Sequence, residues 1–426
     1  MNPLIAVVAD DLTGVCDTGA QFAAAGLRTV GGVDQEFRLK DIPEVLIVNT
    51  QSRSMGGAEA SISVRQAVSW LRRFEPRWFF KKIDTALRGN IAVEVDSMMK
   101  TLGVDSVLYV ASIPGAGRTT VRGCQLFRGI PIKESIHGED RLNPNPIITS
   151  SNVELFSKVP GLEIEGVGFD EVRSGHLDIS SHIRRGSKEI IVFDSETDED
   201  IRRIVAASME IEPSSFLYVG SFGLSNALGR HLSETLGIAK KEKILFDKRR
   251  PPQSGRRVLI VSGSSHPMAR SQLSHLERKG KAEIVQFEPE DLTDRLDSCI
   301  QEAARSSRTL RDRKKGVILT IGEGKSGIRK QSQELVLALG KVVAGLLKSN
   351  GADSLVLVGG ETGHAVCRAL GIERIEILGN ISFVAAYGKP EGTLTGVEIL
   401  VTKGGSLGEE DTLEKVFDFI GSPACQ

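Results

Sequence analysis

The sequence is poor in cysteine and aromatic residues, and it lacks long apolar runs. Five cysteines are scattered over 426 residues without a CxxC spacing, and the seven histidines form no HExxH motif. This pattern favours a reduced, cytoplasmic setting without a structural zinc site. No apolar run approaches the roughly 18 residues that cross a bilayer, and the N-terminus lacks the basic segment of a signal peptide. We therefore expect no membrane partner.

An excess of charge of one sign is also absent. The chain carries 54 Lys and Arg against 55 Asp and Glu, which is a net charge of -1. Proteins that bind nucleic acids usually show a basic excess, so we expect no nucleic-acid partner. The composition does not indicate the oligomeric state, and a homo-oligomer stays open.

Glycine, by contrast, is abundant at 45 residues, and hydrophobic residues make up 40% of the chain. Abundant glycine is typical of α/β enzymes, whose loops make tight turns and close backbone approaches. At roughly 150 residues per domain, the length predicts two or three domains.

Strand-like apolar runs recur along the chain, each followed by polar or glycine residues and then by a helical pattern. This alternation predicts an α/β fold built on mostly parallel sheets flanked by helices. The predicted strands are residues 4–9, 45–48, 78–81, 107–111, 189–193, 216–219, 258–261, 317–321, 355–358 and 399–401. Residues 129–175 contain several prolines and break the pattern, so we interpret them as a loop-rich insertion or an edge of the sheet.

A stretch rich in charge, proline and glycine separates two halves that each show this alternation. It covers residues 240–255 and has no apolar period, which is typical of a linker. We predict a first domain over residues 1–245, a linker over 246–257 and a second domain over 258–426. Each domain is expected to contain its own mostly parallel sheet.

In open α/β sheets, ligands bind beyond the carboxyl ends of the strands, so the loops after strands are the candidate sites. In the first half, Asp10 and Asp11 follow the first predicted strand. Adjacent residues alternate sides, so we expect one carboxylate to bind substrate hydroxyls or magnesium while the other caps the next helix. The alternative is that both carboxylates are solvated caps.

Two further polar loops follow the next strands. One contains Arg53, whose guanidinium can bind a carboxylate or phosphate through two parallel hydrogen bonds, or can simply lie on the surface. The other, from Lys81 to Asn90, concentrates charge at a strand end. An aspartate near a lysine can accept a proton from a hydroxyl, and cations can neutralise an acidic substrate. An ion-paired turn is the alternative, but unused charge at a buried strand end is costly, so we favour a site.

Three glycine-rich turns follow strands in the second half. They contain Ser262 and Ser264, then Gly359 to Gly363, then Gly404 and Gly405. Glycine lets backbone N–H groups approach phosphate oxygens at a helix N-terminus. None of these turns has the spacing of a Walker A motif or of GxGxxG, so a Rossmann dinucleotide site is disfavoured.

Taken in order, these motifs resemble those of the four-carbon acid sugar kinases. In the first half they are Ala9-Asp10-Asp11-Leu12-Thr13-Gly14, Ser52-Arg53-Ser54, Lys82-Ile83-Asp84-Thr85-Ala86-Leu87-Arg88-Gly89-Asn90 and Gly117-Arg118-Thr119-Thr120. In the second half they are Ser262-Gly263-Ser264, Gly359-Gly360-Glu361-Thr362 and Lys403-Gly404-Gly405-Ser406-Leu407-Gly408. The series covers nearly the whole chain. The family usually has Ser-Thr where this chain has Thr85-Ala86, and Asp where it has Glu361.

The resemblance implies an N-terminal acid-sugar-binding domain and a C-terminal nucleotide-binding domain. It implies ATP-dependent phosphorylation of the terminal hydroxyl of threonate, erythronate or a related four-carbon acid, with Mg²⁺ as the usual cofactor. The implied substrate-binding residues are Asp10, Asp11, Arg53, Lys82, Ile83, Asp84, Thr85 and Arg88. The implied ATP-binding residues are Ser262, Ser264, Gly359, Gly360, Glu361, Thr362, Gly363, Gly404 and Gly405. The metal ligands are not indicated.

Within this scheme, Arg53 is expected to pair with the substrate carboxylate. Asp84 and Lys82 are the expected catalytic residues, with Asp84 as proton acceptor and Asp10 as the alternative. The active site is expected in a cleft between the two domains, whose closure would exclude water. A hydrolase or lyase that acts on sugar acids, and a ligand-binding protein without catalysis, are the alternative functions. The sequence does not determine the stereoisomer.

Overall fold

The computed structural model describes residues 2–138, 144–184, 186–238, 256–306, 315–323, 333–349, 351–392 and 396–421. The chain divides into two compact units, Met1–Lys240 and Lys241–Gln426. Of the predicted linker, residues 246–255 lie outside the described residues. Each unit is described by itself below.

The first unit is built on a parallel sheet. Its strands lie in the order β2 (Thr29–Gly32), β3 (Val45–Asn49), β1 (Ile5–Ala9), β4 (Trp78–Lys82), β11 (Phe216–Gly220), β5 (Ser106–Val110), β10 (Lys188–Phe193) and β9 (Leu162–Val167), and neighbouring strands are parallel. Parallel strands are covered by helices on both faces, which explains why they read as continuous apolar runs. The strands predicted from such runs are confirmed, whereas β2 and β9 were not predicted as strands.

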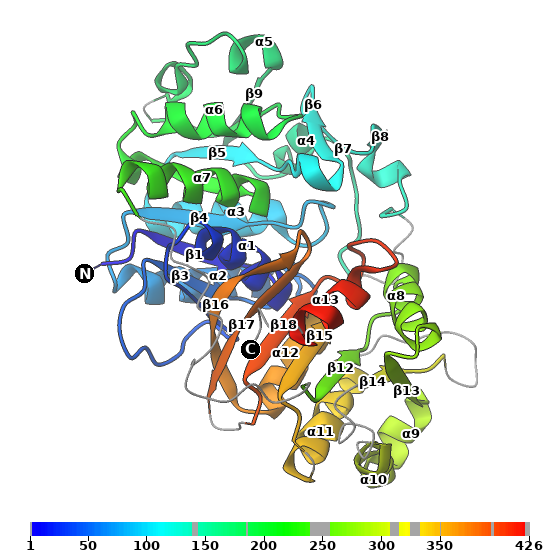
Figure 1. Cartoon of the computed structure of the whole chain (residues 1–426). Helices are drawn as coiled ribbons and strands as arrows, with labels where there is room; N and C mark the ends of the chain where they lie inside the picture. Colours follow the sequence, from blue (N-terminus) through cyan, green and yellow to red (C-terminus); the bar gives the residue numbers. More distant parts are fainter. Residues whose placement is uncertain are drawn as a thin grey trace. The chain divides into compact units, whose positions relative to one another are not determined.

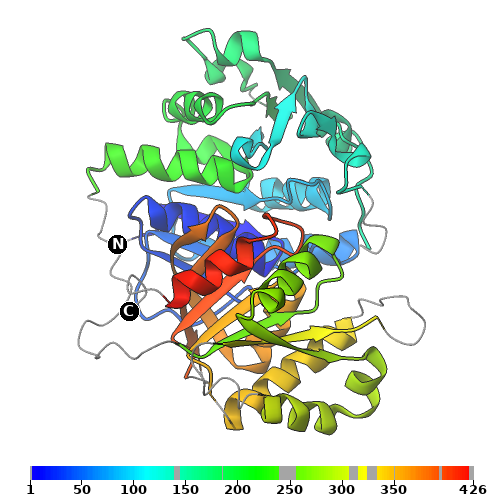
Figure 2. The same cartoon turned by 45° about the vertical axis from the view of Figure 1, so that its right-hand side comes forward.

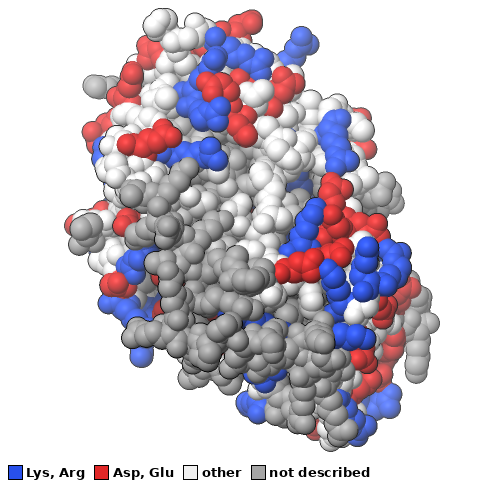
Figure 3. Space-filling view, in the orientation of Figure 1, with Lys and Arg blue, Asp and Glu red and all other residues white. Residues whose placement is uncertain are grey.

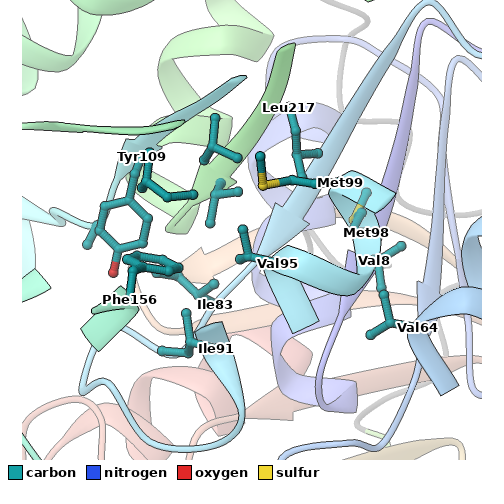
Figure 4. Close-up of a cluster of buried hydrophobic side chains, with 14 of the residues drawn as sticks. Val8, Val64, Ile83, Ile91, Val95, Met98, Met99, Tyr109, Phe156 and Leu217 are labelled. Atoms are coloured by element: carbon teal, nitrogen blue, oxygen red, sulfur yellow. The ribbon is translucent and has the colours of Figure 1, made fainter. Parts of the chain in front are cut away.

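Helices cover both faces of this sheet. The helices α1 (Leu12–Ala24), α6 (Asp198–Ser208) and α7 (Phe222–Thr235) pack as neighbours, and α6 and α7 lie side by side in both views (Figures 1 and 2). The helices α2 (Gly57–Arg72) and α3 (Ile91–Leu102) pack against one another and contribute Val64 and Val95 to a common core (Figure 4). Ala6 and Val8 of β1 join this core, while Val7 between them is also fully buried, as expected for alternating faces of a strand.

The insertion after β5 has more structure than the sequence indicated. Residues 118–131, for which no strand was predicted, form a small antiparallel sheet of β6 (Arg118–Val121), β7 (Cys124–Phe127) and β8 (Ile130–Pro131). Strands this short show no readable period, because their stability comes from pairing rather than from an apolar face. The expectation of an edge is confirmed at β9, the last strand of the sheet order. The other short helices of this unit are η1 (Pro114–Ala116), η2 (Ile132–Glu134), α4 (Asn152–Phe156), α5 (Phe169–Val172), η3 (Ile179–His182) and η4 (Pro213–Ser215).

The second unit contains a mixed sheet. Its strands lie in the order β13 (Ala282–Phe287), β14 (Gly316–Ile321), β12 (Val258–Ser262), β15 (Ser354–Val358), β18 (Ile399–Lys403), β17 (Ala385–Gly392) and β16 (Ile372–Ser382). Neighbours from β13 to β18 are parallel, and β16 and β17 are antiparallel. The helices are α8 (Pro267–Arg278), α9 (Pro289–Asp294), α10 (Leu296–Ser306), α11 (Gln333–Ser349), α12 (Gly360–Ala369) and α13 (Thr412–Gly421). The antiparallel pair was not predicted, because Gly388, Pro390 and Gly392 in β17 favour turns rather than strands.

The predicted α/β class, with a mostly parallel sheet in each half, is therefore confirmed. Within the described residues, none of the helices is long and apolar enough to cross a membrane. On the face shown in Figure 3, acidic and basic side chains are intermixed wherever the surface is coloured. Exposed ion pairs such as that of Arg202 with Glu199 also occur in the first unit.

The start of α6 provides a stability test in the first unit. Thr197 accepts a hydrogen bond from the backbone N–H of Asp200 at 3.2 Å, and Asp200 accepts one from the backbone N–H of Thr197 at 2.9 Å. This reciprocal capping box satisfies two N–H groups that the helix itself leaves unpaired. We expect Thr197→Ala to lower the free energy of unfolding by about 0.5–2 kcal/mol, measured by urea denaturation. Thr197→Ser keeps the hydroxyl and should stay near wild type; equal losses in both variants would contradict this role for the hydroxyl.

Candidate active site

The carboxyl ends of three adjacent strands bring the predicted substrate residues of the first unit together. The strand β1 lies between β3 and β4, with Ala9 opposite Asn49 and Val8 opposite Lys81. The loops that follow these strands therefore emerge side by side at one edge of the sheet. These loops carry Asp10, Asp11, Arg53, Lys82, Ile83, Asp84, Thr85 and Arg88.

Arg53 joins two of these loops through ion pairs with both aspartates. Its Nε and Nη2 donate to the two carboxylate oxygens of Asp10 at 2.8 and 2.9 Å, and its Nη1 donates to Asp11 Oδ2 at 2.6 Å. Asp11 also accepts the backbone N–H of Gly14 at 2.6 Å and so caps α1, as predicted for one of the two aspartates. The two carboxylates nevertheless share one partner, because the planar guanidinium of Arg53 is wide enough to reach both.

The fork of Arg53 that was expected to hold a substrate carboxylate thus holds Asp10. Burial alone would raise the pKa of Asp10, but the charge of Arg53, with those of Lys81 and Lys82, holds it below its usual value. Burial raises the pKa of Asp11, and the neighbouring Asp10 acts in the same direction against the attraction of Arg53. Asp10 is therefore the carboxylate of this pair that stays ionised most readily.

Asp84 lies at the turn after β4 and is held by cations. Its Oδ2 accepts a hydrogen bond from Arg88 Nε at 2.6 Å, and both side chains are largely buried. Burial alone would raise the pKa of Asp84, but Arg88 and Arg53 hold it well below its usual range. These neighbouring cations therefore favour the ionised form of Asp84 near neutral pH.

The two lysines at the end of β4 differ in their surroundings. Lys81 is fully buried and pairs with Glu94 of α3 at 2.7 Å, which makes it part of the packing between the sheet and a helix. Lys82 is also buried, its Nζ donates to the carbonyl oxygen of Ile83 at 2.6 Å, and burial lowers its pKa. Lys82 interacts electrostatically with Asp10, Asp11 and Asp84.

Reasoning from the sequence assigned no role to three residues that lie between β5 and β9. Arg118 Nη1 donates a hydrogen bond to Thr85 Oγ1, and Gln125 Nε2 donates to the carbonyl oxygen of Thr85 at 3.3 Å. Asn145 Nδ2 donates to the carbonyl oxygen of Arg53 at 2.8 Å. The segment between β5 and β9 thus supports two of the loops that carry predicted substrate residues. The Gly117-Arg118-Thr119-Thr120 motif was the signal that could have identified Arg118.

The glycine turns of the second unit also gather at one sheet edge. The strands β12, β15 and β18 are neighbours, with Ser262 opposite Val358 and Val358 opposite Lys403. The N–H of Gly263 donates to Thr362 Oγ1 at 3.1 Å, which links the first turn to the second. Gly405 lies so close to Ser264 that an added Cβ would come within 2.4 Å of its Oγ, which links the third turn to the first.

This edge of the second unit has the properties of a phosphate-binding site. Gly359 adopts φ +99°, a backbone conformation that suits glycine, and α12 begins at the next residue. Gly360 to Gly363 therefore form the first turn of α12, not the loop that the sequence suggested. The N–H groups of a first helical turn lack intrahelical partners and carry partial positive charge, so they attract anions. Ser262 adds a buried Oγ that has no hydrogen-bond partner within the described part of the chain.

Two histidines lie in or beside these turns. His266 Nδ1 accepts the backbone N–H of Met268 at 3.1 Å and so caps α8. His364 lies within α12. Among the described residues, there is no group of three or more His, Cys, Asp or Glu that could hold a metal ion.

Two family models match the chain, one in each half. A model described as a sugar-binding N-terminal domain matches residues 5–228, and one described as a nucleotide-binding C-terminal domain matches residues 259–413. These matches define the class of the protein, in which a sugar-binding domain precedes a nucleotide-binding domain.

Individual relatives narrow this class. A D-threonate kinase of Salmonella typhimurium is 31% identical over 98% of this chain and 99% of its own. A D-erythronate kinase of Heliobacterium modesticaldum is 26% identical over 98% of this chain and 97% of its own. A solved structure from Salmonella typhimurium LT2 has the same fold, with a TM-score of 0.77 at 20% identity over 97% of this chain and 98% of its own. The chain belongs to the four-carbon acid sugar kinase family, as its motifs predicted.

Proposed function

We propose that this protein transfers the terminal phosphoryl group of ATP to the terminal hydroxyl of a four-carbon acid sugar. The observation that carries this proposal is the contrast between the two sheet edges. One edge gathers three carboxylates and several cations, which suits a small polyhydroxy acid. The other edge gathers glycine turns and a helix N-terminus, which suits the phosphates of a nucleotide. D-threonate is the first candidate substrate, followed by erythronate and 3-oxo-tetronate.

In the first unit, the proposed substrate site comprises Asp10, Asp11, Arg53, Arg88 and the segment from Lys82 to Thr85. Carboxylates accept hydrogen bonds from substrate hydroxyls, and the surrounding cations neutralise the acid group. Asp84 is the proposed acceptor and orienting group for the hydroxyl that attacks phosphorus. A carboxylate with a strongly lowered pKa is a weak base, so orientation of the hydroxyl is its larger contribution. Lys82 is proposed to stabilise the negative charge that is shared by the substrate and the transferred group.

In the second unit, the proposed ATP site comprises the residues of the three turns named above: Ser262, Ser264, Gly359, Gly360, Glu361, Thr362, Gly363, Gly404 and Gly405. Backbone N–H groups of the first turn of α12 would donate to phosphate oxygens, whereas the N–H groups of Gly359 and Gly363 already donate to the carbonyl oxygens of Lys403 and Gly359. Mg²⁺ usually binds through nucleotide phosphates, water and one or two carboxylates, and it neutralises charge on the transferred group. The exposed carboxylate of Glu361, in the first turn of α12, suits such a ligand set. The cleft expected between the domains stays a prediction.

A substrate panel tests the proposed function. Purified protein is mixed with ATP, Mg²⁺ and, in separate reactions, D-threonate, L-threonate, D-erythronate and 3-oxo-tetronate, and ADP formation is measured. ADP that appears only with one or more of these acids supports the kinase. Conversion of an acid without ATP would support a hydrolase or lyase instead. Binding of an acid without turnover would support a ligand-binding protein.

The ion pairs of Arg53 lead to a prediction for substrate binding. Arg53→Lys keeps one positive charge but loses the planar fork, so a single ammonium cannot donate to both oxygens of Asp10 and to Asp11 together. The two carboxylates would then be less well held, and the loss of charged hydrogen bonds should cost about 1.5–3 kcal/mol. We expect KM for the acid to rise roughly ten-fold or more, with a smaller change in KM for ATP. An unchanged KM for the acid in steady-state assays would remove Arg53 from the site.

A further inference from the structure

Arg118 is a buried cation beside the proposed substrate site. Its side chain comes from β6, and the residue is only 3% exposed. Arg53 pairs with Asp10 and Asp11, and Arg88 pairs with Asp84, but Arg118 forms no ion pair with a carboxylate of the described residues. A buried charge without a counter-ion is costly, so a fold that keeps one at such a place needs a compensating partner.

The hydrogen-bond donors of Arg118 are incompletely used. Nη1 donates to the hydroxyl of Thr85, and Nη2 lies 3.4 Å from Nε2 of His137. The buried Nε has no partner within the described part of the chain. A guanidinium carries five N–H donors, and its Nε and Nη groups bind the two oxygens of a carboxylate side by side. Arg118 therefore retains the capacity for a charged, two-oxygen acceptor.

The backbone holds Arg118 in place. Its N–H donates to the carbonyl oxygen of Ile113 at 3.1 Å, and its carbonyl oxygen accepts the N–H of Ile113 at 2.7 Å. Ile113 lies shortly after β5, so this pairing attaches the small antiparallel sheet to the carboxyl end of the main sheet of the unit. The side chain is thus presented to Thr85 by two paired backbone segments and not by an exposed loop.

The charges around this position leave an excess of one cation. Among the described residues, four cationic side chains (Arg53, Lys82, Arg88 and Arg118) interact electrostatically with three carboxylates (Asp10, Asp11 and Asp84), which leaves one positive charge in excess. Burial lowers the pKa of Arg118 to about 10, and although Asp84 attracts its charge, Arg88 and Arg53 repel it. A ligand with one negative charge would balance this cluster.

We propose that Arg118 pairs with the carboxylate of the substrate and is the residue that makes this site select an acid over the corresponding neutral sugar. Arg53 then acts as a positioning residue that holds Asp10 and Asp11 for the substrate hydroxyls. This inference rests on the proposed function and deepens it by assigning the carboxylate to a particular side chain.

The test measures selection for the charge and not activity alone. Wild type, Arg118→Met and Arg118→Lys are titrated by calorimetry with D-threonate and with D-threonamide, which lacks the negative charge. We expect wild type to bind the acid at least 100-fold more tightly than the amide, because removing one partner of a buried charged pair leaves the other charge buried and unpaired. In Arg118→Met this preference should fall to within about three-fold, because affinity for the acid is lost while affinity for the amide is nearly retained. Arg118→Lys should lie between the two and serves as the second variant if Arg118→Met does not fold.

Arg173→Met is the matched control. Arg173 belongs to the same unit and directly follows α5. It pairs with Asp200 of α6 at 2.8 Å and is far in sequence from the segment Lys82 to Thr85. It should keep the wild-type preference for the acid. If Arg118 has a purely structural role, Arg118→Met should lower the affinity for the acid and the amide equally, and that result would overturn the proposal. Equal affinity of wild type for the acid and the amide would also overturn it. A different outcome is that wild type forms no ADP with any of the acids while Arg118→Met still loses the preference for the acid over the amide. That combination would reject the kinase function but support the pairing of Arg118 with the carboxylate of the acid.

Discussion

Asp84→Asn is expected to lower kcat by roughly 10²–10⁴-fold while binding of the acid stays within a few-fold of wild type. Asparagine is nearly isosteric with aspartate but has no negative charge to orient the attacking hydroxyl or to receive its proton. In the folded protein, Arg88 and Arg53 hold the pKa of Asp84 well below its usual range, although burial alone would raise it. The carboxylate is therefore ionised at neutral pH, and the substitution removes a full charge from the site.

Steady-state kinetics with saturating ATP and calorimetry with the acid measure this effect. Asp194→Asn is a matched control, because Asp194 is also buried but accepts the backbone N–H groups of Arg122 and Gly123. We expect its kcat to remain within a few-fold of wild type. If Asp10→Asn lowers kcat and Asp84→Asn does not, Asp10 is the group that orients the hydroxyl. If neither lowers kcat, the reaction needs no side-chain base in this unit.

The pH dependence of kcat gives a separate check on Asp84. A group whose folded pKa is lowered stays charged until the pH falls through that lowered value. The charge of Asp84, and the stability that it contributes, should thus persist throughout the range above its unfolded pKa of about 4. We expect no acid limb of kcat from Asp84 between pH 5 and pH 8, and any limb found there should survive in Asp84→Asn.

Gly359→Val is expected to weaken ATP binding by roughly 100-fold or more while binding of the acid is unchanged. Gly359 has φ +99°, where a residue with a Cβ is strained by about 1–2 kcal/mol, and a branched side chain is strained most. The new side chain would also point toward Thr362 and Ser264, because an added Cβ lies 3.6 Å from Thr362 Oγ1 and 3.8 Å from Ser264 Cβ. Both the turn and the space for a phosphate would therefore be disturbed.

Calorimetry with a non-hydrolysable ATP analogue and, separately, with the acid measures the two affinities. Gly280→Val is the matched control, since Gly280 also lies in the second unit and has φ +66°, with nothing within 4 Å of an added Cβ. It should show the strain as a loss of stability but keep ATP affinity near wild type. A loss of acid binding with intact ATP binding in Gly359→Val would exchange the ligands assigned to the two units.

Local sequence patterns predicted much of the fold and most of the loops that carry the candidate sites. Apolar runs such as Val45–Asn49 identified strands, because a parallel strand is buried on both faces and leaves a continuous apolar signature. Polar and glycine residues directly after such runs identified the candidate sites, because ligands bind at the carboxyl ends of parallel strands. The strand β17 was missed because it has no such apolar run. Its stability comes from pairing with β16 and β18 and not from its own composition.

Partner choice among charged groups was decided by the tertiary structure alone. The residue types at Asp10, Asp11 and Arg53 made a charged site predictable, because charges at a buried strand end need partners. That Arg53 binds both aspartates depends on strands β1 and β3 being neighbours, although the residues are more than 40 positions apart in sequence. Likewise, Arg118 reaches Thr85 only because the backbone of β6 pairs with Ile113 after β5. Sequence by itself determined the kinds of residues and their places at strand ends, whereas the three-dimensional pairing of strands determined which charges meet.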